Sequence, residues 1–202
     1  MSMFRSLISV MGGGSILPPA YQQVEYIEGT GTQYIDTGFV DTGHSDYEME
    51  FELTTLARNY QMYIGGYRYA PAFPKAFANS ETFSTMRIQS SSDISFTVSP
   101  GILYDLKVEG TTATLNNTSQ AISRGRGVDP NLTVYIFSCS GEPNLISAMK
   151  LYGLKMYNNS VLIREFIPCY RKSDNEIGLY DKVNDVFYTN DGNGTFIKGP
   201  DV

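Results

Sequence analysis

Apolar and polar residues alternate along much of this chain, most regularly between residues 46 and 53. Tyr47, Met49, Phe51 and Leu53 fall on one side of an extended backbone, and four carboxylates fall on the other. These carboxylates are Asp46, Glu48, Glu50 and Glu52. A period of two residues is typical of a strand that covers a core with one face and meets solvent with the other. The segment therefore predicts a strand.

The rest of the chain after Tyr21 repeats this pattern in short pieces separated by turn residues, without a convincing helical period. Further strands are expected near 60–64, 85–89, 94–98, 103–109, 112–116, 132–138, 148–157, 161–167, 179–188 and 195–198. Asn158 and Asn159 predict a tight hairpin turn within 157–160, because Asn tolerates positive φ. Pro168 is expected to stop the strand before it, since proline cannot donate to a ladder. Short strands at this spacing favour an antiparallel sandwich.

The first twenty residues differ in composition and are interpreted as an arm preceding one domain at 21–202. An apolar stretch is followed by Gly12–Gly14 and then by Pro18 and Pro19, which combine a flexible joint with a stiff one. The apolar side chains of the arm are Phe4, Leu7, Ile8, Val10 and Met11. Docking into a neighbouring subunit is one interpretation, because a free arm would expose apolar surface. A frayed terminus and a segment packed on its own domain are the alternatives.

Composition agrees with one all-β domain and limits the partners. A chain of 202 residues can bury a sizeable core, and its 15 Tyr and 11 Phe suit half-buried pleated surfaces. The net charge of −6 opposes nonspecific binding to nucleic acid or to an anionic membrane. No apolar run reaches the length of a membrane span, and the N-terminus lacks the apolar core of a secretion signal. Cys139 and Cys169 are expected to be buried and reduced.

Two long segments at the ends of the chain carry a resemblance. The first is LPPAYQQVEYIEGTGTQYIDTGF, Leu17–Phe39, and the second is VLIREFIPCYRKSDNEIGLYDKVNDVFYTNDGNGTFIKGPDV, Val161–Val202. Both resemble blocks of a family of phage and prophage virion proteins built on a concanavalin A-like (laminin G-like) jelly roll. The middle, Val40–Ser147, is much less recognisable.

The resemblance implies an antiparallel two-sheet concanavalin A-like jelly roll in a non-enzymatic structural component of a phage particle, either an auxiliary capsid (decoration) protein or a tail protein. Its partners would be other virion proteins and host surface glycans, its location the virion, and its state in the assembly oligomeric. Neither nucleic acid nor membrane is an expected partner. A free carbohydrate-binding module is the alternative interpretation.

The carboxylates of 46–53 also raise a glycoside hydrolase hypothesis. Laminarinase-like hydrolases share the concanavalin A-like fold and carry a similar E-x-D-x-E strand, with the outer carboxylates as nucleophile and acid/base. Here Glu48 and Glu52 hold the outer positions and Glu50 replaces the central Asp. Retaining hydrolysis needs its two carboxyl groups about 5–5.5 Å apart, closer than positions i and i+4 of a regular strand. We therefore expect no catalytic residues.

Three smaller features complete the candidates. Asp181, Asp185 and Asp191 lie in loops that could supply calcium ligands, although the same sequences are typical of hairpin turns, so no cofactor is expected. Tyr67, Arg68 and Tyr69 are the predicted glycan- or partner-binding residues, since tyrosine presents a large surface with few rotors. The single histidine, His44, is expected in an exposed loop rather than in a catalytic triad.

Overall fold

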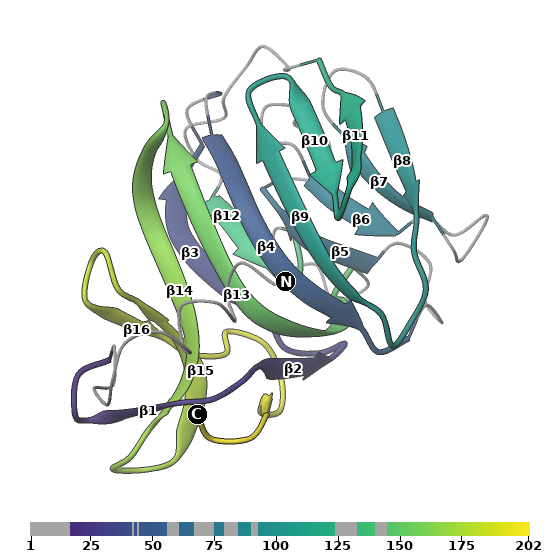
Figure 1. Ribbon diagram of the computed structural model, residues 1–202. Helices are drawn as coiled ribbons and strands as arrows, with labels where there is room; N and C mark the ends of the chain where they lie inside the picture. Colours follow the sequence, from purple (N-terminus) through teal and green to yellow (C-terminus); the bar gives the residue numbers. More distant parts are fainter. Residues whose placement is uncertain are drawn as a thin grey trace.

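The computed structural model describes the chain from Leu17 onward, with gaps. The described residues are 17–41, 43, 45–55, 61–66, 75–78, 85–89, 93–123, 133–139 and 145–202. Over these ranges the protein is all-β, contains no helix, and pairs its named strands antiparallel in two layers (Figure 1). Residues 1–16 of the predicted N-terminal arm, together with Tyr67, Arg68, Tyr69 and His44, lie outside the described residues.

The larger sheet has eleven strands among the described residues, and eight of them follow the order β11-β10-β9-β4-β13-β14-β15-β16. β13 pairs with β4 along one edge and with β14 and β2 along the other. The strands are β1 (Tyr21–Gln23), β2 (Ile27–Thr30), β4 (Ser45–Leu53), β9 (Leu103–Glu109), β10 (Thr112–Leu115), β11 (Thr118–Ala121), β13 (Ala148–Asn158), β14 (Val161–Arg171), β15 (Glu176–Asp181), β16 (Val186–Tyr188) and β17 (Ile197–Lys198).

The smaller sheet lies behind the larger one in Figure 1 and, in the described part of the chain, has the order β3-β12-β5-β6-β7-β8. Its strands are β3 (Ile35–Val40), β5 (Gln61–Gly65), β6 (Lys75–Ala78), β7 (Thr85–Gln89), β8 (Asp93–Thr97) and β12 (Thr133–Ile136). Five strands have no counterpart among the ranges expected from the sequence: β1, β2, β3, β6 and β11. The predicted antiparallel β-sandwich is confirmed at this level of detail.

The core lies between the two sheets and follows the alternation seen in the sequence. Tyr47, Met49, Phe51 and Leu53 of β4 are all essentially inaccessible to solvent. The Phe51 ring meets Tyr63 of the opposite sheet at 5.4 Å between centroids, so aromatic side chains join the layers. Burial of such a surface is the main stabilising contribution to a sandwich of this size.

The two end segments of the chain fold against each other, although more than a hundred residues separate them. β1 pairs with β14 through Tyr21↔Arg171 to Gln23↔Cys169, and β17 pairs with β2. Val24 forms a further bridge with Asp201. Figure 1 shows β1, β2, β14, β15 and β16 gathered at one end of the molecule. The segments Leu17–Phe39 and Val161–Val202 therefore form one structural unit.

Strand β14 runs through Pro168, so the prediction that this proline stops the strand is wrong. The Pro168 carbonyl oxygen accepts a hydrogen bond from the Val24 amide at 3.0 Å. The carbonyl group and the nitrogen of Pro168 therefore point away from β15. At that point β14 exchanges its neighbour β13 for β1. Proline lacks an N–H at the point where β14 changes its partner strand, so no hydrogen bond between β14 and β15 is lost.

Local features agree with other expectations. Asn159 and Ser160 have φ of 49° and 63°, so the predicted type I′ hairpin turn is present but is centred one residue later than on Asn158 and Asn159. Cys139 and Cys169 are buried free thiols, as expected. In the described part of the chain, no helix is long and apolar enough to cross a membrane.

Candidate functional site

The outer face of the large sheet, which points away from the sandwich core, carries a row of alternating charges. Glu48 of β4 is directly opposite Lys107 of β9 and Lys155 of β13, and Lys155 is opposite Glu165 of β14. The ion pairs measure 3.5 Å for Lys107–Glu48 and 3.7 Å for Lys155–Glu165. Each pair of opposite charges at directly paired positions stabilises neighbouring strands by about 0.2–1 kcal/mol. We call these four residues the Glu48 row.

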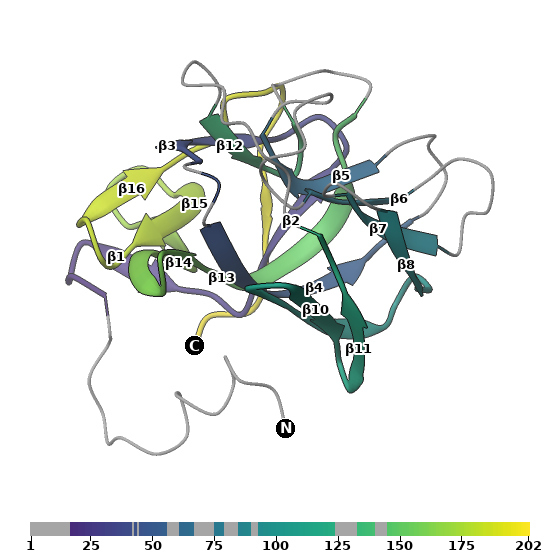
Figure 2. The same cartoon turned by 90° about the horizontal axis from the view of Figure 1, so that it is seen from above.

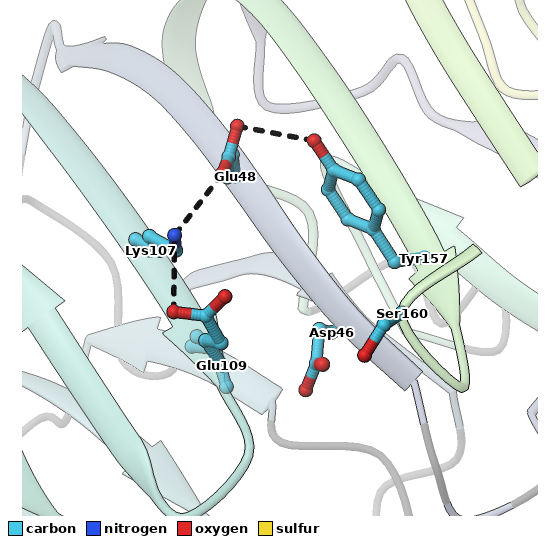
Figure 3. Close-up of a pocket in the computed structure, with 7 residues that line it drawn as sticks. Asp46, Glu48, Lys107, Glu109, Tyr157 and Ser160 are labelled. Carbon is cyan, nitrogen blue, oxygen red and sulfur yellow. Dashed lines mark hydrogen bonds and ion pairs between the residues drawn. The ribbon is translucent and has the colours of Figure 1, made fainter. Parts of the chain in front are cut away.

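A polar pocket of about 240 Å³ lies at one end of the Glu48 row. Alternation along β4 and β9 directs its side chains outward, and the type I′ turn after β13 closes it. Figure 3 shows the polar side chains arranged around the hollow. The described residues that line it are Asp46, Glu48, Lys107, Val108, Glu109, Tyr157 and Ser160.

Hydrogen bonds and ion pairs hold the pocket's side chains in place. The Tyr157 hydroxyl donates to Glu48 Oε2 at 3.3 Å, and Lys107 Nζ lies 3.0 Å from Glu109 Oε2 (Figure 3). Asp46 Oδ1 accepts the Gly110 amide at 3.0 Å. The bond to Glu109 is the main reason why the pKa of Lys107 is raised, so its ammonium stays charged. Burial, aided by the Glu48 carboxylate, raises the pKa of Tyr157 to about 12.

The side chains of this pocket are suited to binding a polar ligand. Three carboxylates and one ammonium give a net charge of −2, with a phenol and a hydroxyl beside them. A phenol that stays protonated far above neutral pH is a hydrogen-bond donor and a poor base. The described lining residues contain neither histidine nor cysteine. Such a set can pair with hydroxyl or ammonium groups of a ligand.

Glu52 belongs to a second charged row and does not meet Glu48. Its carboxylate accepts from Lys150 Nζ at 2.9 Å and from the Tyr152 hydroxyl at 3.2 Å. The bulge in this part of the sheet is in β13, where Tyr152 is the extra residue, so β4 stays extended. Four residues of extended strand span about 13 Å. The expectation that Glu48, Glu50 and Glu52 share a solvated face needs correction at Glu50, which is fully buried.

The candidate calcium ligands Asp181 and Asp191 accept hydrogen bonds in two separate turns. Asp181 Oδ1 accepts the amides of Glu165 and Val183, and Asp181 Oδ2 accepts from Asn184. Asp191 Oδ2 accepts the Asp36 amide at 2.8 Å. The bond from Val183 is that of an Asx turn, whereas the bonds from Glu165 and Asp36 connect these turns to strands β14 and β3.

Asp185 has a different partner, the Tyr180 hydroxyl, which donates to it at 3.2 Å. Within the described ranges, no group of three or more His, Cys, Asp or Glu side chains is arranged to hold a metal ion.

A second hollow, of about 380 Å³, lies where the two sheets end at β8 and β10–β11. Phe96, Tyr104 and Leu115 form its buried floor, and polar residues form its rim. Gln120 Nε2 donates to the Ser95 carbonyl oxygen at 2.6 Å across this opening. The bond links the edge strands of both layers, so part of the exposed edge of β8 is already occupied.

Only part of the pocket is predictable from the sequence. The alternating pattern points to Glu48 but not to Lys107, Glu109, Tyr157 or Ser160. Alternation along Leu103–Glu109 could have placed Lys107 and Glu109 on an outer face, but their position beside Glu48 depends on the pairing of β9 with β4. The predicted binding residues Tyr67, Arg68 and Tyr69 lie outside the described residues.

Comparison with known proteins provides no further assignment: no family model and no curated protein sequence matches this chain.

Proposed function

We propose that the protein is a non-enzymatic structural component of a bacteriophage particle, a capsid decoration or tail protein built on a concanavalin A-like jelly roll. The observation that carries the proposal is the junction of the two end segments. The residues that resemble the virion family, Leu17–Phe39 and Val161–Val202, are neighbours in space and share strand pairs. Their resemblance therefore concerns one continuous piece of structure, which supports its use as a guide to function.

Anchoring to the particle is assigned to the N-terminal arm. Its apolar residues Phe4, Leu7, Ile8, Val10 and Met11 precede a domain that has a buried hydrophobic core. An apolar segment is stabilised by docking on a neighbouring subunit, because docking removes its surface from water. Deletion of residues 1–16 is expected to leave a folded domain and to abolish incorporation into particles.

The pocket beside Tyr157 supports a second role, binding of a glycan displayed by the host. A volume of about 240 Å³ has room for a single sugar ring. Carboxylates such as Glu48 and Glu109 accept bonds from neighbouring sugar hydroxyls, and the Lys107 ammonium donates one. The same pocket favours a free carbohydrate-binding module as the second candidate function.

Hydrolysis receives less support from the same face. Glu48 lines the pocket, whereas Glu52 is bonded to Lys150 and Tyr152. Their separation along β4, about 13 Å, exceeds the 5–5.5 Å of retaining enzymes and the roughly 6.5–9.5 Å of inverting ones.

Quantitative mass spectrometry of gradient-banded virions tests the structural proposal. Hundreds of copies per particle would indicate a capsid protein, and a handful a tail or vertex protein. Complete absence would overturn the structural role and favour the free module. A glycan array probed with the wild type and with Glu48→Gln then tests the pocket, with Asp174→Asn as a control far from it. Binding that is unchanged by Glu48→Gln would place the glycan site elsewhere.

A further inference from the structure

The hollow of about 380 Å³ lies where the open edges of the two sheets approach each other. In the described part of the chain, β8 ends the smaller sheet on this side and β11 ends the larger one. Figure 1 and Figure 2 both show β8 beside β10 and β11. We call this hollow the edge pocket. Its volume falls within the range of about 300–1,000 Å³ that is usual for small-molecule sites.

The turn between β10 and β11 holds one polar side chain of the edge pocket in a fixed position. Asn116, with φ of 52°, belongs to this turn. Its Oδ1 accepts the Asp105 amide at 2.8 Å, and its backbone amide donates to the Asp105 carbonyl oxygen at 2.7 Å. The side-chain nitrogen, Nδ2, has no hydrogen-bond partner in the structure. Asn116 therefore presents a hydrogen-bond donor at the rim of the pocket, and the bonds to Asp105 hold it there.

The rest of the rim is polar and uncharged. Gln120 Nε2 donates to the Ser95 carbonyl oxygen, which leaves Gln120 Oε1 as an acceptor. The hydroxyls of Thr97 and Thr118 line the same opening and have no hydrogen-bond partner. No charged side chain is found among the described residues that line the pocket. A rim of this kind can exchange hydrogen bonds with a neutral ligand, but it cannot replace the water around a charged one.

The floor of the edge pocket is apolar. Phe96, Tyr104 and Leu115 form it and keep 5%, 7% and 5% of their surface exposed. The Tyr104 ring is held by the Ser99 amide, which donates to its hydroxyl at 2.8 Å, and by the Phe51 ring at 5.7 Å between centroids. An apolar floor below a polar rim suits a ligand with a C–H face and hydroxyl groups around its edge.

An extended peptide is another kind of ligand that binds at the edge of a sheet, by adding a strand to it. On the outer edge of β8, however, the Ser95 carbonyl oxygen is already bonded to Gln120 at 2.6 Å. An added strand would have to displace this bond. The edge pocket therefore fits a compact ligand better than an extended one.

We propose that the edge pocket binds a single neutral sugar ring. Asn116 Nδ2 donates to a ring hydroxyl, Gln120 Oε1 accepts from another, and the C–H face of the ring lies on the floor of Phe96, Tyr104 and Leu115. The inference goes beyond the proposed function, because this site is separate from the pocket beside Tyr157 and needs no particle. It can fail while virion incorporation holds, and the reverse is equally open.

An NMR titration of the purified full-length protein with neutral methyl glycosides and N-acetylglucosamine tests the proposal. For one of these sugars, a Kd on the order of 1 mM is expected, as is usual for a ligand of this size. The side-chain amides of Asn116 and Gln120 should shift, whereas Tyr157 and Ser160 should not. Raising the NaCl concentration should leave the Kd unchanged, because neither the ligand nor the described lining is charged.

Asn116→Asp should weaken binding about tenfold, the effect of losing one hydrogen-bond donor to the ligand. Aspartate tolerates positive φ and keeps the acceptor for the Asp105 amide, so the turn is retained. Asn117→Asp is the matched control: it adds the same charge to the same turn at a position that does not line the pocket, and should leave the Kd unchanged. Thr97→Val removes a rim hydroxyl of the opposite sheet and should weaken binding by about threefold to tenfold.

Several results would overturn the proposal. Absence of any shift at Asn116 and Gln120 with all of these sugars would show that the edge pocket binds none of them. Shifts at Tyr157 and Ser160 instead would place the sugar in the other pocket. Equal weakening by Asn116→Asp and Asn117→Asp would show a general effect of charge, and glycerol binding with the same affinity would show that no ring is recognised. Circular dichroism establishes whether each variant is folded, and Thr97→Val decides the question if Asn116→Asp is not.

Discussion

The Asp181→Ala substitution removes a carboxylate that makes four polar contacts in the structural unit formed by the two end segments, which we call the end unit. Asp181 is completely buried and lies 3.3 Å from Arg164 Nε. Its oxygens also accept the amides of Glu165 and Val183 at 3.1 Å each, and the Asn184 side chain at 2.7 Å. Truncation to alanine leaves three hydrogen-bond donors without this acceptor, and it leaves the Arg164 guanidinium without its counter-charge.

The expected loss of stability follows from these contacts. Removing one partner of a buried ion pair costs about 3–5 kcal/mol. The Arg164 side chain is 19% exposed, so water compensates part of the loss and the lower end of that range, about 3 kcal/mol, is expected. In a chain of this size 1 kcal/mol shifts Tm by about 2–4 °C, so the midpoint should fall by roughly 6–12 °C.

Thermal unfolding followed by circular dichroism measures the effect, with Asp174→Ala as the matched control. Asp174 also pairs with an arginine of β14, Arg171, at 2.7 Å, but the two side chains are 48% and 39% exposed. Its substitution should therefore lower Tm much less than Asp181→Ala does. Equal shifts for the two variants would refute the assignment of Asp181 as a buried turn anchor. A rise in Tm with CaCl2 that EDTA reverses and Asp181→Ala abolishes would make this residue a calcium ligand instead.

Three further predictions concern the same sheet. Gly178→Ala should lower Tm by several degrees, because the added Cβ would collide with the Tyr188 carbonyl oxygen and displace β16 from β15; a variant as stable as the wild type would contradict this packing. Burial raises the pKa of Cys169 to about 12, so a thiol reagent at pH 8 should label it only after unfolding, and rapid native labelling would show an open thiol. The pKa of Tyr157, about 12 in the folded state, exceeds its unfolded value near 10, so stability due to this phenol is complete below pH 10 and is lost between pH 10 and 12. Denaturant unfolding at pH 9 and 11.5 should therefore show a smaller loss for Tyr157→Phe than for the wild type, and equal losses would contradict the burial.

Alternation made the fold class predictable, because each strand carries its own signal. β4, β7 and β9 coincide with expected segments or differ from them by a single residue. β11 was missed, since Thr118–Ala121 has no apolar face: it is an exposed edge strand stabilised by its hairpin with β10. The error at Pro168 has a related cause, because a lost donor matters only if a partner strand lies opposite it, and pairing cannot be seen in one segment.

The candidate site was less predictable for the same reason. Glu48 belongs to the pocket because it contacts Lys107 on β9 and Tyr157 on β13, which are 59 and 109 residues away in sequence. Local patterns show that each side chain points outward but do not show which strands are neighbours. The burial of Glu50 could not be predicted either, because the alternating pattern places Glu50 on the same face of the strand as Glu48 and Glu52.

Steric constraints give a physical reason to expect that residue types are more restricted at the ends of this chain than in its middle. In the end unit, side chains are fixed by close approach and by turn bonds. A Cβ at Gly192 would strike the Thr32 carbonyl oxygen, and Asn190 must accept the Tyr34 amide at 3.1 Å for the loop to cover the edge of β3. Such positions accept one or two residue types. In the central strands, the core requires only apolar residues of suitable volume at every second position, and many sequences satisfy that requirement. We therefore expect substitutions to be tolerated least where the two ends of the chain meet and most on the strands between them.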